Sequence, residues 1–200
     1  MSGTQQSVEV TVTRSAIGLC YPLLQKGVAL SITVGVSIME LLTSQFGIAP
    51  EYIKNKIQTI FLDGVPVDDE EMTIIEDGVT LALSSAMPGL AGAILRKGSH
   101  LKRMRREISS VVPEDITTVH RGEITMKFFN LLLPDLGRLF LEKGVWVDGK
   151  DVQELIKRCH YAGNGLIGVI VNGVPFPLEK LNGVGEQVVG RVFLTVKIEE

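Results

Sequence analysis

The stretch IFLDGVP at residues 60–66 returns in altered form as VIVNGVP at residues 169–175. In both copies, an apolar run typical of a buried strand precedes an acidic or amide residue followed by glycine. Asp63-Gly64 and Asn172-Gly173 favour tight turns, because both residues of each pair tolerate positive φ. Each stretch therefore predicts a strand, a two-residue turn and a short continuation.

Further landmarks repeat in the same order around these two stretches. Residues 8–12 and 124–128 alternate apolar and polar side chains, the pattern of a half-buried strand. The sequences LLQKGV (23–28) and FLEKGV (140–145) each predict a Lys-Gly turn that leads into a second strand. Apolar strands over residues 79–83 and 192–198 close the two copies. This repetition predicts an internal duplication, and two unrelated units with common turn chemistry are the alternative.

One amphipathic helix is expected in each copy. In the first, Ser37 followed by Glu40 forms a capping box, and in the second Asp151 and Glu154 repeat that spacing. The apolar stripes that follow the caps are formed by Ile38, Leu41, Leu42 and Phe46 in the first copy and by Val152, Leu155, Ile156 and Cys159 in the second. The repeated order is therefore strand, strand, helix, strand, turn, strand.

Composition narrows the class of protein. The 200 residues carry a net charge of −3 and are 45% hydrophobic, which fits a folded protein without an overall positive field for nucleic acid. Cys20 and Cys159 lie far apart and form no CxxC pair, which argues against a disulfide-stapled secreted domain.

No apolar run approaches the roughly 20 residues of a membrane-spanning helix. With no secretory signal pattern at the N-terminus, we expect a cytoplasmic protein without membrane association.

The first copy resembles the ubiquitin-like β-grasp superfamily, in particular its ThiS/MoaD-like sulfur-carrier branch. The resemblance rests on FLDGVPVDD (61–69), on IIEDGVTLALSSAMPGLAG (74–92) and on the capped helix before them. It covers residues 8–92, and residues 122–198 more thinly. It implies an α+β fold with two tandem β-grasp units, over residues 1–92 and 118–200, joined by a basic helical connector over residues 93–117.

The sulfur-carrier chemistry of that branch is not expected here. Sulfur carriers act through a free C-terminal glycine carboxylate, whereas the sequence PGLAG (88–92) is internal and the given chain ends in VKIEE. Cleavage after Gly92 would be needed to expose such a carboxylate, so a processed sulfur carrier is one alternative function. A single full-length species of 21.8 kDa would exclude it.

The leading functional hypothesis is a non-catalytic module that binds another protein, as an accessory or regulatory subunit. Such a module would act by surface recognition or by strand pairing at a sheet edge. We predict no catalytic residue and no cofactor. No metal site is predicted either, because His100, His120 and His160 lie in three separate segments. A homodimer is a second way to cover the apolar strand faces of such small units.

Two groups of residues are candidate binding sites. The cations of the connector are candidates for contact with an acidic protein partner, namely Lys102, Arg103, Arg105 and Arg106. Nucleic acid is disfavoured, because no aromatic side chains interleave with these cations. The second group predicts an anion or small-molecule site between the two units, which is the other alternative function, and consists of Gly89, Gly92, Arg96 and Lys97. The acidic run over residues 68–71 is interpreted as a solvated loop.

Overall fold

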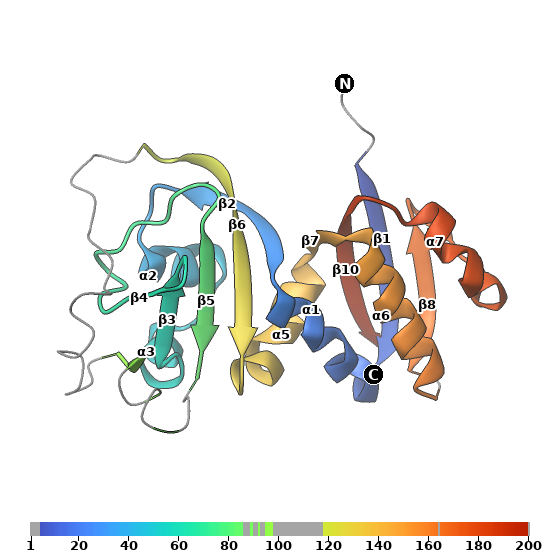
Figure 1. Ribbon diagram of the computed structural model, residues 1–200, viewed down its shortest axis with the longest axis horizontal. Coiled ribbons are helices and arrows are strands. Elements are labelled where there is room, and N and C mark those ends of the chain that lie inside the picture. The colour runs from blue at the N-terminus through green and yellow to red at the C-terminus, as the bar shows by residue number, and fades with distance from the viewer. Residues whose placement is uncertain are drawn as a thin grey trace. The chain divides into compact units, whose positions relative to one another are not determined.

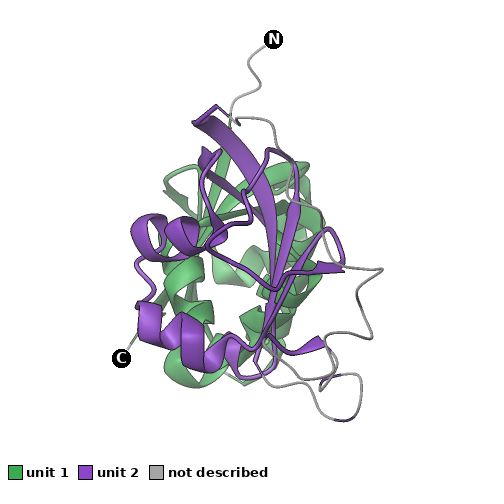
Figure 2. Cartoon of the chain, turned by 90° about the vertical axis from the view of Figure 1, so that its left-hand side faces the viewer, with its two compact units in different colours: residues 1–28, 134–200 green, residues 29–133 purple. Residues whose placement is uncertain are grey.

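The computed structural model describes residues 5–85, 89, 92, 95–97, 118–163 and 165–199. The chain forms two compact units, residues 1–28 with 134–200 (unit 1) and residues 29–133 (unit 2) (Figure 2). Both units combine helices and strands, so the α+β class predicted from the sequence is confirmed. Each unit contains five of the ten described strands.

The sheet of unit 2 has the strand order β4-β3-β5-β6-β2 (Figure 1). Its strands are β2 (Val28–Val34), β3 (Thr59–Leu62), β4 (Val65–Pro66), β5 (Thr80–Ser84) and β6 (His120–Phe129). β3 pairs antiparallel with β4 and with β5, whereas β5 pairs parallel with β6. The central pair of this sheet is therefore parallel, with Leu81 opposite Met126 and both side chains fully buried.

The sheet of unit 1 has the strand order β7-β10-β1-β8-β9. Its strands are β1 (Gln6–Thr13), β7 (Val145–Asp148), β8 (Leu166–Val171), β9 (Val174–Pro175) and β10 (Arg191–Glu199). β1 pairs parallel with β10 and antiparallel with β8, and β10 pairs antiparallel with β7. Val10 lies opposite Val196 at the centre of the parallel pair, and both are fully buried.

The two predicted Asx-Gly turns are confirmed, and they close on their neighbouring strands in the same way. Asp63 and Asn172 have φ of 48° and 51°, and each is followed by a glycine with positive φ. The Asp63 Oδ1 atom accepts a hydrogen bond from the Thr80 backbone N at 2.7 Å, at the start of β5. The Asn172 Oδ1 atom accepts from the Ser7 backbone N at 2.9 Å, in β1. In unit 1, β1 therefore occupies the place that β5 occupies in unit 2.

The boundaries of the two units differ from the predicted domains 1–92 and 118–200. The first strand of each half lies in the same unit as the remaining strands of the other half: β1 joins β7 to β10, and β6 joins β2 to β5. The physical reason is the parallel pairing at the centre of each sheet. Parallel neighbours cannot be joined by a tight turn and need a long connection, so a distant strand can supply the partner.

The helix of unit 2 begins at the predicted capping box. Its parts are α2 (Ile38–Glu40) and the π-helical η2 (Leu41–Gln45), and α3 (Pro50–Lys56) follows. The Ser37 Oγ atom accepts from the Glu40 backbone N at 3.1 Å, as predicted. The Gln45 side chain bonds both the backbone N and the backbone O of Thr33, each at 2.8 Å. These bonds attach the helix to β2.

In unit 1, the cap of the principal helix differs from the prediction. The helices that lead into or belong to this unit are η1 (Arg14–Cys20), α1 (Tyr21–Lys26), α5 (Leu132–Lys143), α6 (Gly149–Tyr161), η4 (Leu178–Gly183) and α7 (Val184–Gln187). The prediction of a cap at Asp151 is wrong, because Asp148 caps α6 by accepting from the Lys150 backbone N at 2.8 Å. Asp151 lies inside the helix, where it pairs with Lys26 at 2.6 Å.

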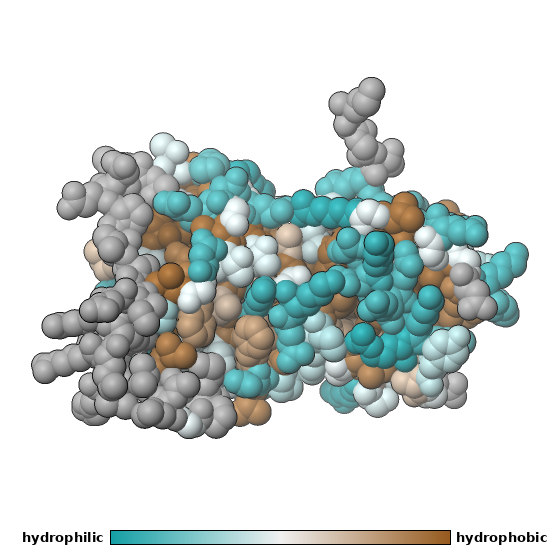
Figure 3. Space-filling model, viewed as in Figure 1, coloured by the Kyte–Doolittle hydropathy of each residue, from teal (hydrophilic) through white to brown (hydrophobic). Residues whose placement is uncertain are grey.

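Both predicted apolar stripes lie in the core. Val152, Leu155, Ile156 and Cys159 of α6 are buried, as are Ile38, Leu41, Leu42 and Phe46 in unit 2. The outer face of α6 is charged, and Figure 3 shows this side of unit 1 as largely hydrophilic. Among the described residues, no helix is both long enough and apolar enough to cross a membrane.

The Asn172 turn generates a test of the fold. Asn172→Ala should lower the free energy of unfolding by about 1–3 kcal/mol, because alanine loses the bond to Ser7 and is strained at positive φ. Asn172→Gly should cost less, since glycine keeps the backbone conformation and loses only the side-chain bond. Urea unfolding measures both values. Equal stability of wild type and the alanine variant would contradict this role of the turn.

Candidate functional site

The described part of unit 2 contains an open groove of about 480 Å³. The groove lies where the start of the capped helix, the first turns of α3 and the acidic run 68–71 meet. Its lining residues are Met39, Pro50, Glu51, Lys54, Asp68, Asp69, Glu70 and Glu71. Five of these eight carry carboxylates, so the groove presents a negative surface beside the apolar side chains of Met39 and Pro50.

The acidic run is held in place by hydrogen bonds. The Asp69 Oδ1 atom accepts from the backbone N atoms of Glu71 and Met72, at 3.1 and 3.0 Å. The Thr73 hydroxyl donates to the Asp69 carbonyl at 2.6 Å, and the Met39 backbone N donates to the Glu70 carbonyl at 2.9 Å. The segment is therefore fixed against the helix start, and the interpretation as a plain solvated loop missed this organisation.

Lys97, one of the predicted anion-binding residues, contacts this acidic run. Its Nζ atom lies 2.7 Å from the Glu70 Oε1 atom, and the two side chains are only 13% and 16% exposed. Its backbone N donates to the Gln58 carbonyl at 2.9 Å, just before β3 begins. Lys97 therefore attaches the end of the described segment 95–97 to unit 2, at two separate points.

The other predicted anion-binding residues lie nearby in the same segment. The Arg96 guanidinium donates from Nε to the Gln58 Oε1 atom at 2.6 Å, and its backbone N donates to the Gly92 carbonyl at 3.1 Å. Gly92 is buried, whereas Gly89 is exposed with φ of 78°. An anion bound by Arg96 and Lys97 would have to compete with Gln58 and Glu70 for these cations.

The candidate partner-binding cations belong to the predicted connector. Lys102, Arg103, Arg105 and Arg106 lie outside the described residues, as does most of the predicted connector 93–117.

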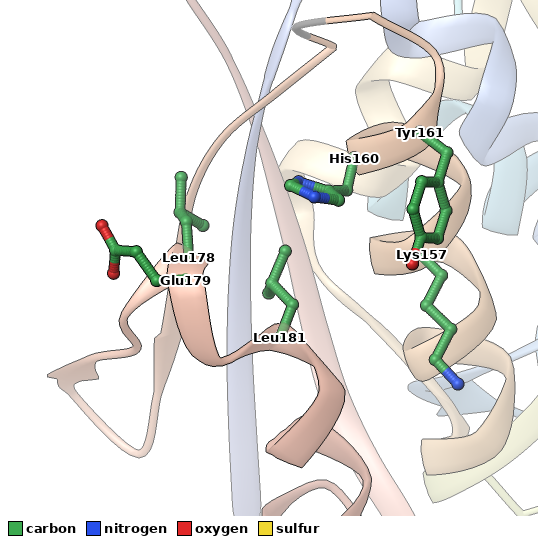
Figure 4. Close-up of a pocket in the computed structure, with 6 residues that line it drawn as sticks. All are labelled: Lys157, His160, Tyr161, Leu178, Glu179 and Leu181. Carbon is green, nitrogen blue, oxygen red and sulfur yellow. The ribbon is translucent and has the colours of Figure 1, made fainter.

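A second, smaller hollow lies in unit 1, at the end of α6. It has a volume of about 90 Å³ and is lined by Lys157, His160, Tyr161, Leu178, Glu179 and Leu181. In Figure 4 the His160 ring and Leu181 face the hollow, whereas the Glu179 carboxylate and the Lys157 amine point away from it. The volume is well below the roughly 300–1,000 Å³ of ordinary ligand pockets, so we do not assign a ligand to it.

Within the described ranges, no group of three or more His, Cys, Asp and Glu side chains is arranged to hold a metal ion. Comparison of the chain with protein-family models, with curated proteins and with solved structures found no match.

The Lys97–Glu70 ion pair can be tested by a double-mutant cycle. Lys97→Ala, Glu70→Ala and the double variant should give a coupling energy of about 1 kcal/mol in urea unfolding, because the pair is mostly shielded from water. The exposed pair Arg138–Glu142, at 44% and 41% exposure, serves as the matched control. Its coupling should not exceed about 0.5 kcal/mol. Equal coupling in the two pairs would contradict an anchoring role for Lys97.

Proposed function

We propose that this chain is a non-catalytic protein-interaction module of two β-grasp (ubiquitin-like) units, serving as an accessory or regulatory subunit. The shared plan of the two sheets supports the fold part of this proposal. Each sheet has a two-residue edge strand, an Asx-Gly turn closed by a side-chain hydrogen bond, and a parallel central pair. The two sheets share these features and their strand directions, whereas the chain order of the two central strands differs, because β1 rather than β10 lies beside β8 in unit 1.

The acidic groove of unit 2 is the observation that carries the functional part. The backbone of the acidic run is fixed by hydrogen bonds to the Asp69 carboxylate and to the Glu70 carbonyl, so little backbone entropy would be lost on binding. Apolar side chains lie beside the acidic run, and the exposed Met72 follows it directly. A partner segment that carries Lys or Arg beside apolar residues is complementary to this surface.

Surface recognition fits the structure better than strand addition at a sheet edge. Beside β3 in unit 2 and beside β8 in unit 1, the edge strands β4 and β9 are two residues long, and each contains a proline, Pro66 or Pro175. Proline has no backbone N–H to donate, and short proline-containing edges resist pairing with another strand. We therefore place the proposed contact in the groove rather than at these edges.

Affinity capture with matched charge variants tests this function. Wild-type protein should retain a stoichiometric partner, and the double variant Glu51→Lys/Glu71→Lys should lose it, because both changes reverse charge within the groove. Glu154→Lys is the control, since Glu154 is an exposed carboxylate on α6 in unit 1. Retention of the partner by the groove variant would refute the proposal, as would its loss from both variants alike.

A further inference from the structure

The two cysteines, far apart in the sequence, meet in unit 1. Cys20 is the last residue of η1, and Cys159 lies in the last turn of α6. Both side chains are fully buried and both thiols are free. Each thiol shifts the pKa of the other, as expected of neighbouring side chains. This juxtaposition joins the segment that follows β1 to the end of the principal helix.

The surrounding contacts hold the two segments together. The Arg158 guanidinium donates from Nη1 to the Leu19 carbonyl at 3.0 Å, beside the cysteines. The Thr13 backbone N donates to the Gly165 carbonyl at 3.0 Å, at the end of β1. A Cβ atom on Gly165 would lie only 2.9 Å from the Ala16 Cβ, so this approach requires glycine. The two cysteines are therefore held on tightly packed segments.

The pKa values of the two thiols shift in opposite directions, so the two cysteines have different roles in the proposed reaction. Interaction with the Cys159 thiol raises the pKa of Cys20, and burial raises it further. The interaction with the Cys20 thiol lowers the pKa of Cys159. Burial opposes this shift, and the positive charge of Arg158 supports it. The first thiolate of this coupled pair therefore forms at Cys159, stabilised by the Cys20 thiol.

We propose that Cys20 and Cys159 are a disulfide-forming pair that is oxidised by hydrogen peroxide and covalently ties the N-terminal segment to α6. The two thiols lie on segments that already pack against each other, so a disulfide requires side-chain movement rather than refolding of unit 1. η1 is a 3₁₀ helix, whose weaker hydrogen bonds favour local opening, and peroxide is small enough to enter through such an opening.

The reaction balances with one peroxide molecule. The Cys159 thiolate attacks one peroxide oxygen, the O–O bond breaks, and the hydroxide released takes up the former thiol proton as water. The Cys20 sulfur then attacks the sulfur of the sulfenic acid formed on Cys159. The S–S bond forms, the S–O bond breaks, and the hydroxyl leaves with the Cys20 proton as a second water. Two electrons pass from the sulfurs to the peroxide.

The disulfide would close a loop that spans most of the chain. Cross-links across long loops restrict the unfolded chain most strongly, so the oxidised protein should be more stable than the reduced one. It would also prevent β1 from leaving the sheet of unit 1, because Cys20 follows β1 by one short helix. The expected consequence is a unit 1 whose stability depends on redox conditions.

The test treats the folded full-length chain with limited peroxide and measures its intact mass, peptide map and melting temperature. We expect a mass loss of about 2 Da, a peptide that links Cys20 to Cys159, and a melting temperature higher by roughly 5–10 °C. Dithiothreitol should reverse all three changes. Two thiols that remain open to alkylation after unfolding would overturn the proposal, as would separate oxidation of each sulfur without a linked peptide.

Single variants provide the control. In Cys20→Ala and in Cys159→Ala, peroxide should produce no linked peptide and no rise in melting temperature. Each variant is compared with itself before and after treatment, so any loss of stability from the substitution itself cancels. A rise of the same size in either variant would show that the effect does not come from this pair, and would also overturn the proposal.

Discussion

The parallel strand pair at the centre of each sheet is the constraint on which the structure depends. β1 pairs with β10, the first described strand with the last, and β5 pairs with β6 across the long connection between the two halves. Parallel neighbours cannot be closed by a tight turn, so the chain must make a long excursion between them. This requirement allows β1 and β6 to be supplied by the opposite halves of the chain, and it makes each unit depend on both halves.

The cysteine pair of unit 1 and the acidic groove of unit 2, on which the two proposals rest, both depend on contacts between distant segments. In unit 1, the strand β1 brings η1 to the end of α6, and Cys20 thereby meets Cys159. In unit 2, the described segment 95–97 contacts residues far away in the sequence: the Lys97 backbone bonds Gln58, just before β3, and the Lys97 side chain reaches Glu70. In both places, contacts between segments distant in the sequence position chemically useful side chains.

Local features were predictable from the sequence, because they depend on neighbouring residues. Both Asx-Gly turns and the Ser37 cap follow from backbone preferences and short-range hydrogen bonds. The Asp148 cap was missed because Asp151 and Glu154 have the same spacing as the capping box of the first copy.

The helix α5 was also missed, although its sequence contains features typical of a helix. Pro134 lies near its start, and its buried positions have helical spacing, namely Leu132, Leu133, Leu136, Phe140 and Leu141.

Strand partners were not predictable in the same way. The alternation of Val8, Val10 and Val12 shows that one face of β1 is buried, but it fits pairing with β10 as well as a hairpin with β2. The positive charge of Arg96 and Lys97 was visible in the sequence, but not their bonds to Gln58 and Glu70, because those residues lie 38 and 27 positions away. Long-range pairing is a property of the whole chain and has no local signature.

The central claim is that β1 and β6 each complete the sheet of the other half of the chain. Nuclear Overhauser effects between backbone protons of isotope-labelled protein test this pairing most directly. The structure predicts cross-strand effects between β1 and β10 in parallel register, with Val8 opposite Leu194 and Val10 opposite Val196. Cross-strand effects that instead join β1 to β2 in an antiparallel hairpin would contradict the central claim.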